Sequence, residues 1–154
     1  MLKFYTVGTI EKSIKNFPNI TAKVDIPNGS IVTANLGTKE AALPTEATAK
    51  GDDLYVVINS AVGDTHFSEA EVVEAGRYLN LFQLKAVDGQ QIQFDDSHVN
   101  YATGGYDDIE IGDVFVVDTD GKFTNADAEG YAITFEVTDK ISFGGDGFIV
   151  KVIA

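Results

Sequence analysis

The chain contains no cysteine and no tryptophan, and histidine occurs only twice among its 154 residues. The absence of cysteine excludes disulfides, thiol catalysis and zinc sites built on thiolates. A Ser-His-Asp triad would have to use His66 or His98, and no serine lies in the context of a nucleophile elbow. The glycine-rich segment 143–148 has neither the lysine nor the following helix of a phosphate-binding loop. We therefore predict a protein that is not an enzyme and binds no cofactor.

Acidic side chains are the one catalytic resource that is plentiful. A pair of carboxylates can hydrolyse a glycosidic bond, so a small hydrolase is kept as the weakest hypothesis. Its candidate residues are Asp95, Asp96, Asp107, Asp108 and Glu110. No pair among them is distinguished by the sequence, and the chain lacks the tryptophan that sugar-binding faces favour.

Positive charge is scarce, because 11 lysine and arginine residues face 24 acids and the formal net charge is −13. Such a surface repels phosphate backbones, so we predict that the chain does not bind nucleic acid. The charge is also uneven. Residues 1–50 carry six lysines and four acids, which is +2, whereas residues 51–154 carry five basic and twenty acidic residues, which is −15. Either the N-terminal third contacts a different partner from the rest of the chain, or the asymmetry arises by chance and the acidic residues form a solvated face.

No apolar run approaches the length of a membrane span, and no membrane partner is expected. The N-terminal segment is interrupted by Glu11, Lys12 and Lys15, so it lacks the continuous apolar core of a secretion signal. We expect the protein to stay where it is made unless it leaves as part of an assembly.

Alternation of apolar and polar residues with a period of two dominates the chain. Residues 20–26 alternate in this way, which is typical of a strand with one buried face. The runs 54–58 and 114–117 are apolar throughout, which indicates strands buried on both sides. Further strands are expected at 78–84, 91–94, 131–137 and 148–153, with Asn-Gly or Asp-Gly turn signals at 28–29, 88–89, 120–121 and 146–147. About nine short strands predict an all-β fold, a single antiparallel barrel or sandwich.

Little helix is expected, and the best candidate is the segment 66–76. Ser68 and Glu71 have the spacing of a capping box, and Gly76 could end the helix.

The length of the chain fits one domain, which we divide into two parts. Residues 1–19 alternate poorly and are predicted to form an extended N-terminal arm, which could reach about 60 Å. Residues 20–154 are predicted to form the β domain. Two segments without clear periodicity, 37–53 and 99–113, are predicted to be long loops, and loops of this length are usually functional or mobile.

The segment DTDGK at 118–122 can be interpreted as a calcium loop or as a turn between strands. An EF-hand loop needs oxygen ligands at positions 1, 3 and 5, glycine at position 6 and glutamate at position 12. Asp118, Asp120 and Glu129 stand at positions 1, 3 and 12, but Lys122 and Phe123 stand at positions 5 and 6. The ammonium would repel a cation, and phenylalanine cannot easily make the sharp turn. We therefore predict a β-hairpin with the Asp-Gly pair at its turn.

Two other sets of residues could bind a metal ion. A calcium ion could be held if Asp118, Asp120, Asp127 and Glu129 converged. The DDSH segment at 95–98 offers Asp95, Asp96 and His98 as ligands. The same segment can instead be a turn, with Asp96 or Ser97 bonding its own backbone. The spacing matches no closed metal site, so we predict no bound metal.

The N-terminal arm combines aromatic and cationic side chains, which make good interface anchors. The candidate partner-binding residues are Lys3, Phe4, Tyr5, Lys12, Lys15 and Phe17. The alternative, in which the aromatic residues of the arm pack on their own domain, is equally open.

The segments 75–99, 109–123 and 129–154, together with the PNGSIV turn at 27–32, resemble capsid decoration proteins of tailed bacteriophages. Such proteins are also called cement or auxiliary head proteins. The resemblance covers roughly the last two thirds of the chain. It lies in strand order, turn placement and a small, acidic, β-rich character, and not in a sharp motif.

The resemblance implies a structural protein that binds the outer surface of a phage head and stabilises the shell. The implied partner is the major capsid protein, self-association as a trimer or other oligomer is implied as well, and no catalytic residues carry over. The implied location is the capsid exterior of the virion, after synthesis in the host bacterial cytoplasm. The alternative function is a carbohydrate- or calcium-binding β module built on loops 99–113 and 118–129.

Overall fold

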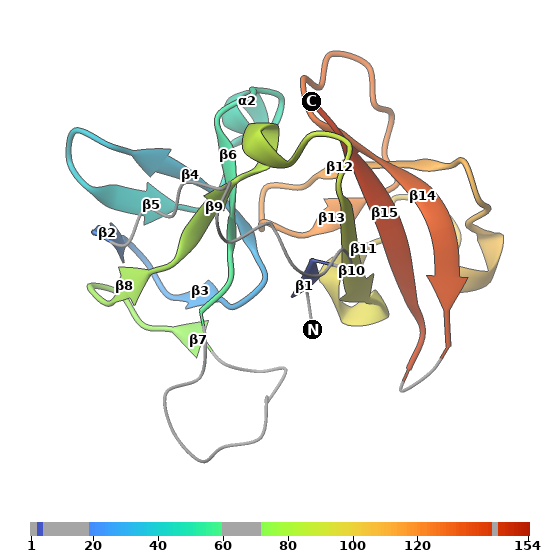
Figure 1. The fold of residues 1–154 in the computed structure, drawn as a ribbon, viewed down its shortest axis with the longest axis horizontal. Coiled ribbons are helices and arrows are strands. Elements are labelled where there is room, and N and C mark those ends of the chain that lie inside the picture. Colours follow the sequence, from blue (N-terminus) through green and yellow to red (C-terminus); the bar gives the residue numbers. More distant parts are fainter. Residues whose placement is uncertain (1–2, 5–18, 60–71, 143–144) are drawn as a thin grey trace.

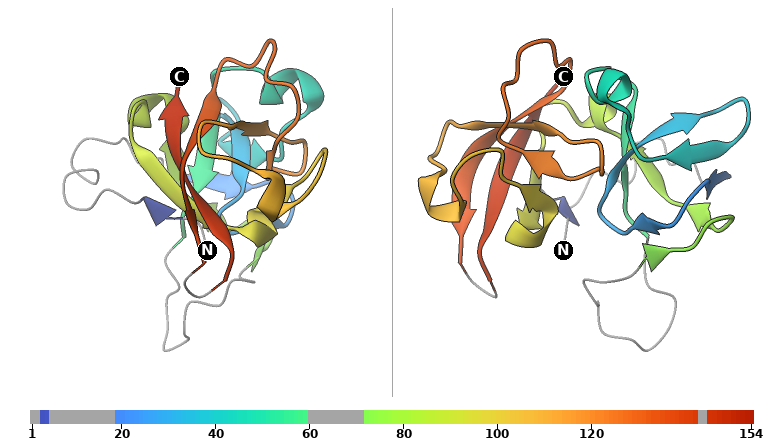
Figure 2. Two further views of the ribbon diagram at one scale, coloured as in Figure 1. Left: turned by 90° about the vertical axis from the view of Figure 1, so that its right-hand side faces the viewer. Right: turned by 180° about the vertical axis from the view of Figure 1, so that it is seen from behind.

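The computed structural model describes residues 3–4, 19–59, 72–142 and 145–154. These residues form two main sheets that lie side by side (Figure 1), and the view from behind shows the same separation (Figure 2). The all-β prediction is confirmed, because the fold is mostly strand, with a nearly closed barrel-like sheet and a curled half-barrel.

The seven-stranded sheet has the order β1-β10-β15-β14-β12-β13-β11. Its strands are β1 (Lys3–Phe4), β10 (Gln91–Asp95), β11 (Val99–Asn100), β12 (Val114–Val117), β13 (Phe123–Thr124), β14 (Thr134–Ile141) and β15 (Gly147–Ile153). Neighbouring strands run antiparallel except β11 and β13, which are parallel. The long β14–β15 hairpin forms the centre of this sheet.

The six-stranded sheet has the order β8-β2-β5-β4-β6-β9, with β2 and β5 parallel. Its strands are β2 (Ile20–Ala22), β4 (Ile31–Asn35), β5 (Glu40–Ala42), β6 (Leu54–Val57), β8 (Tyr78–Leu79) and β9 (Leu81–Gln83). A separate ribbon joins β3 (Ile26–Pro27) to β7 (Val72–Val73). Within the described residues, the helical elements are α2 (Glu46–Ala49) and three 3₁₀ turns, η1 (Leu84–Val87), η2 (Asp96–His98) and η3 (Tyr106–Asp108).

Strand β6 divides the interior into two hydrophobic cores. Because successive side chains of a strand point to opposite faces, Leu54 and Val56 enter the core of the seven-stranded sheet, while Tyr55 and Val57 enter the second core. All four residues are buried, as expected for a strand that is apolar on both faces. Strand β6 therefore packs against both cores, one on each of its faces.

Phenylalanine rings fill the larger core around Phe94 of β10, which is fully buried. Its ring stacks on Phe123 at a centroid distance of 3.9 Å and meets Phe115 edge-on at 6.0 Å. Aromatic contacts of these two kinds are the favoured geometries for ring pairs. Phe94 thus connects β10 to β12 and β13.

The β12–β13 hairpin fastens the two sheets to each other. Its turn residue Gly121 accepts a hydrogen bond from the Ile31 amide at the start of β4, with N and O 2.8 Å apart. The approach is so close that a Cβ on Gly121 would lie 2.5 Å from the Ile31 carbonyl oxygen. Only glycine fits here, and its φ of 79° also favours glycine.

The segment 37–53, predicted as one long loop, contains β5 and α2. Its alanines pack between β2 and β4, which overrides their weak strand preference. Helix α2 begins after Thr45, whose hydroxyl accepts from the Thr48 amide at 3.3 Å while the Thr48 hydroxyl accepts from the Thr45 amide at 2.8 Å. This reciprocal cap supports a helix of one turn.

The predicted helix at 66–76 is wrong where the structure describes it. Residues 66–71 lie outside the described part of the chain. Val72 and Val73 instead form β7 opposite Pro27 and Ile26, because valine pairs well in a half-buried ribbon.

Two expected strands are interrupted by side-chain hydrogen bonds. The segment 78–84 breaks at Asn80, whose amide donates to the Asn59 side-chain oxygen at 2.7 Å. The segment 20–26 breaks between β2 and β3, where Asp25 accepts from the Ala75 amide at 2.9 Å. In each case a side-chain oxygen accepts the hydrogen bond of a backbone amide, in place of a carbonyl from a neighbouring strand.

The turn signal at 146–147 marks the end of the β14–β15 connection, because Ile141 pairs with Gly147, so that Asp146 lies in the connection and Gly147 begins β15. A Cβ on Gly147 would come within 2.5 Å of the Phe94 carbonyl oxygen. This glycine also allows β10 to approach β15 closely.

Of the predicted N-terminal arm, the structure describes only Lys3–Phe4 and residue 19. The backbone of Lys3–Phe4 forms β1, which pairs with β10 at the edge of the seven-stranded sheet. The candidate partner-binding residues Tyr5, Lys12, Lys15 and Phe17 lie outside the described residues. The arm and its boundary at residue 19 stay predictions.

Candidate functional site

The segment DTDGK forms the predicted hairpin between β12 and β13, with Val117 opposite Phe123. The Asp118 amide donates to the Lys122 carbonyl at 2.8 Å, and the Gly121 amide donates to the Asp118 carbonyl at 3.1 Å. These bonds close a three-residue loop with glycine at positive φ, a common hairpin type. The turn is one residue longer than the two-residue turn that the Asp-Gly pair suggested.

The carboxylates of this hairpin accept hydrogen bonds from nearby N–H groups. The side-chain amide of Asn100, on β11, donates to Asp118 at 3.0 Å and to Asp120 at 2.8 Å. Asp120 also accepts from the Lys122 amide at 3.0 Å. Sequence analysis missed Asn100, because the parallel pairing of β11 with β13 that brings it here leaves no local signal.

The four acids proposed as a calcium loop do not gather into one cluster. The Asp127 carboxylate accepts from the Glu129 amide at 3.1 Å, away from the Asn100 bridge. Across the described residues, no three histidine or acidic side chains are placed to share a metal ion.

Asp118 provides a pH-dependent contribution to stability. The hydrogen bond from Asn100, followed by those from Thr119, holds the pKa of the Asp118 carboxyl below its ordinary value of 3.8, although partial burial opposes this. A carboxyl with a lowered folded-state pKa stabilises the fold above its unfolded pKa, and this contribution is lost as the pH falls through the folded pKa.

We predict that Asp118→Asn lowers the free energy of unfolding at pH 7 by about 1 kcal/mol, a value reduced for solvent screening. The difference from wild type should shrink as the pH falls from about 4, where the carboxyl of the unfolded chain becomes protonated, through the lowered pKa of the folded state. Urea unfolding at several pH values measures this difference in the free energy of unfolding. Asp127→Asn is the control, because it removes the same charge from another turn. A difference that stays constant down to pH 2 would contradict the assignment.

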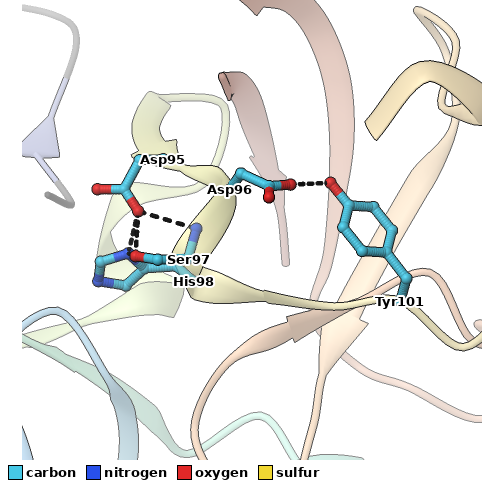
Figure 3. Close-up of polar contacts among 5 residues, drawn as sticks. All are labelled: Asp95, Asp96, Ser97, His98 and Tyr101. Carbon is cyan, nitrogen blue, oxygen red and sulfur yellow. Dashed lines mark hydrogen bonds and ion pairs between the residues drawn. The ribbon is translucent and has the colours of Figure 1, made fainter. Parts of the chain in front are cut away.

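The DDSH segment is a turn, built differently from the one predicted. Asp95 is the residue that caps it, and not Asp96 or Ser97 (Figure 3). One carboxylate oxygen of Asp95 accepts from the Ser97 amide at 3.0 Å and from the Ser97 hydroxyl, and it lies 3.0 Å from Nδ1 of His98. The 3₁₀ turn η2 follows from this cap.

Asp95, Ser97 and His98 have the residue types of a catalytic triad but not its geometry. In a triad, one imidazole nitrogen faces the serine and the other faces the aspartate. Here the same nitrogen, Nδ1 of His98, lies 3.4 Å from the Ser97 hydroxyl and 3.0 Å from Asp95. The serine hydroxyl also donates to Asp95, so the arrangement organises a turn and does not activate a nucleophile. His66 lies outside the described residues.

The loop 99–113 is fastened to the sheet at two places. The Tyr101 hydroxyl donates to Asp96 (Figure 3), and burial together with this bond raises the pKa of Tyr101 above its ordinary value. The Lys140 ammonium donates to the carbonyls of Tyr106 at 2.7 Å and Ile109 at 2.9 Å, and it lies 4.2 Å from the centre of the Tyr106 ring. The loop also contains β11 and η3, so it is less irregular than predicted.

Aspartate side chains act throughout the fold as acceptors for backbone amides. At least nine do so: Asp25, Asp88, Asp95, Asp108, Asp113, Asp118, Asp120, Asp127 and Asp139. Seven of them bond within three residues of themselves, as in capped turns. Of the residues suggested for a hydrolase, Asp95, Asp96 and Asp108 are thus engaged in local hydrogen bonds.

A surface hollow of about 680 Å³ lies between strand β4 and the segment 47–53. Residues 33–36 form one side, and Ala47, Thr48 and residues 51–53 form the other. Asp52 on its rim is paired with Lys85 at 2.6 Å, and both side chains are exposed. The hollow is open to solvent.

Comparison with known proteins identifies no relative: no family model, no curated protein and no solved structure matches the chain. Among the described residues, no helix is both long enough and apolar enough to cross a membrane.

Proposed function

We propose that this chain is a structural decoration protein, which binds the outer surface of a tailed-phage head and reinforces the shell without catalysing a reaction. The observation that carries the proposal is the way its polar groups are used. The carboxylates at the hairpin, at η2 and at loop 99–113 are tied to nearby amides and hydroxyls. Such bonds stiffen turns around two packed cores, which suits a part whose role is mechanical.

The sequence resemblance supports the same function and supplies the partner, the major capsid protein. The N-terminal segment is the proposed docking element. Residues 1–19 carry three lysines and one glutamate, a balance of +2, while residues 20–154 account for the remaining −15 of the net −13. A basic segment on an acidic domain is suited to an acidic surface on the partner, and attraction of this kind weakens with salt.

Cosedimentation with purified capsid shells tests the proposal. We predict that deleting residues 2–19 abolishes binding, because it removes all the candidate partner-binding residues. Thermal unfolding and circular dichroism must show that the β domain still folds. Since the deletion also removes β1, a second variant, Lys12→Glu/Lys15→Glu, keeps β1 and is expected to bind roughly tenfold more weakly.

The matched control is Lys23→Glu/Lys151→Glu, which makes the same change in net charge at two exposed lysines of the β domain. It should bind as wild type does. Full binding by the deletion variant would refute docking through the arm. Failure of the wild-type protein to bind shells would refute the proposed function itself.

A further inference from the structure

A row of four side chains crosses the outer face of the six-stranded sheet. The residues on either side of Thr21 in β2 are buried, so Thr21 itself points to the outer face. Thr21 lies beside Tyr78 of β8 and beside Glu40 of β5, and Glu40 lies beside Asn35 of β4. The row therefore runs from β8 to β4 over three spacings between strands, about 14 Å.

The two ends of this row differ in shape. At one end, Tyr78 is the most exposed large apolar side chain among the described residues, at 68%. At the other end, Asn35 and Leu36 line the hollow of about 680 Å³ between β4 and α2. Elements α2, β4, β5, β2 and β8 follow one another down the left of Figure 1. The row thus has a protruding ring at one end and a hollow at the other.

The hollow has the chemistry to hold a tyrosine side chain. Leu36 and Ala47 contribute apolar contacts to its lining, and Asp52 and Asp53 contribute carboxylates. A buried aromatic ring needs such apolar contacts, and its hydroxyl needs an acceptor. The same kind of bond exists within the chain, where the Tyr55 hydroxyl donates to Asp53 at 2.7 Å. Tyrosine rings that fill pockets are frequent anchors of protein interfaces.

A two-fold axis through the middle of the row brings its two ends together. Rotation about this axis exchanges the ends, so the Tyr78 ring of each copy lies over the hollow of the other. A two-fold interface needs a surface that is complementary to itself in this way. The occupant of the hollow that fits this geometry is thus a second copy of the chain, because one partner fills both ends of the row at once.

The distribution of charge favours contact through this part of the molecule. Residues 19–59 and 72–83, which hold the six-stranded sheet, carry four basic and six acidic residues, a balance of −2. Residues 84–142 and 145–154 carry four basic and fourteen acidic residues, a balance of −10. The net charge opposes self-association everywhere, but contact through the six-stranded sheet keeps the two strongly acidic parts apart and so makes the repulsion smallest.

We infer that the chain forms a two-fold dimer in which Tyr78 of each copy occupies the hollow between β4 and α2 of the other. The inference does not depend on capsid binding, and its test contains no capsid. The interface is small, so we expect a Kd of about 10–100 µM. Well below that concentration the chain is a monomer, and the stability of Tyr78 variants can be compared there without a contribution from the dimer.

Sedimentation equilibrium over about 5–500 µM protein measures the dimer directly. Tyr78→Ala should weaken it at least about tenfold, because both anchoring rings are lost. Ile111→Ala is the matched control, since Ile111 is 67% exposed but lies between η3 and β12, away from the six-stranded sheet, and it should dimerise as wild type does. Raising the salt from about 0.1 M to about 1 M shortens the Debye length from about 10 Å to about 3 Å and should tighten the dimer, because the remaining charge is repulsive.

A mixture of two variants tests the contact between ring and hollow. Ala47→Arg places a long side chain in the hollow beside Asp52 and Asp53, so it should prevent dimerisation although Tyr78 is intact. Tyr78→Ala lacks the ring but keeps an open hollow. When one of the two variants carries a fluorescent tag, the mixture should show a heterodimer that is tighter than either homodimer. The reason is that the heterodimer restores one contact and contains no clash.

A wild-type chain that stays monomeric up to about 500 µM at both salt concentrations overturns the inference. The same conclusion follows if Tyr78→Ala dimerises as wild type does, if Ile111→Ala is weakened equally, or if the mixture associates no better than the separate variants. Oligomers larger than a dimer also overturn it, because a two-fold interface closes at two copies.

Discussion

Replacing Gly121 with alanine is expected to lower the free energy of unfolding by about 3 kcal/mol. Two effects add. Alanine at a φ of 79° is strained by about 1 kcal/mol, and its Cβ would lie 2.5 Å from the Ile31 carbonyl oxygen. Because that obstacle is backbone, the hairpin must withdraw from β4, which also weakens the hydrogen bond from the Ile31 amide. The total free energy of unfolding of a domain is typically only about 5–15 kcal/mol.

Gly89→Ala is the matched control for this prediction. Gly89 has a φ of 76°, but nothing lies within 4 Å of the Cβ that alanine would add. Its loss should be only the strain of about 1 kcal/mol. Urea denaturation of both variants separates the two effects, and equal losses would show that the hairpin does not depend on its contact with β4.

Truncating Phe94 to alanine is expected to remove about 4 kcal/mol, the second large effect. The ring is fully buried and contacts Phe123, Phe115 and Phe148. Its removal leaves a cavity among rigid aromatic neighbours that belong to three other strands, so little collapse can fill the space. The variant should also lose near-ultraviolet circular dichroism, because the stacked pair with Phe123 is broken.

Tyr78→Ala provides the comparison, since Tyr78 is 68% exposed on β8. That change should alter the free energy of unfolding by no more than about 0.5 kcal/mol. Thermal unfolding followed by calorimetry measures both variants. A Phe94→Ala protein as stable as Tyr78→Ala would mean that the core around Phe94 is not packed as described.

The sequence predicts the parts of this fold that are controlled by neighbouring residues. Strand β6 is recognisable because four successive apolar residues suit a strand that faces two cores. The hairpin at 118–122 is recognisable because an Asp-Gly pair separates two apolar strands. Such features need no knowledge of distant segments.

Features created by distant contacts escape the same reasoning. The Asn59 side chain accepts the hydrogen bond of the Asn80 amide, which interrupts the strand there. The Asn100 side chain bridges two aspartates of the hairpin. The partners in these bonds are 18 to 21 residues apart in the sequence. Val72 and Val73 pair with a strand more than forty positions earlier, and so the helical pattern around them misleads. At the DDSH segment the kind of structure was predicted correctly, but the capping residue was Asp95 because β10 extends one residue further than its apolar run.

The aspartates that accept hydrogen bonds from backbone amides serve the fold through their acceptor oxygens, which an uncharged side chain can also provide. An asparagine side chain presents the same acceptor oxygen without the charge, although it forms the weaker, neutral bond. Nine such exchanges would change the net charge from −13 to −4, since −13 + 9 = −4, while each turn keeps its acceptor. Nine of the 24 acidic residues are thus tied to how the chain closes its turns and loops. Because each exchange replaces a charge-assisted bond with a weaker neutral one, a less acidic chain with the same two sheets would need compensating stability elsewhere.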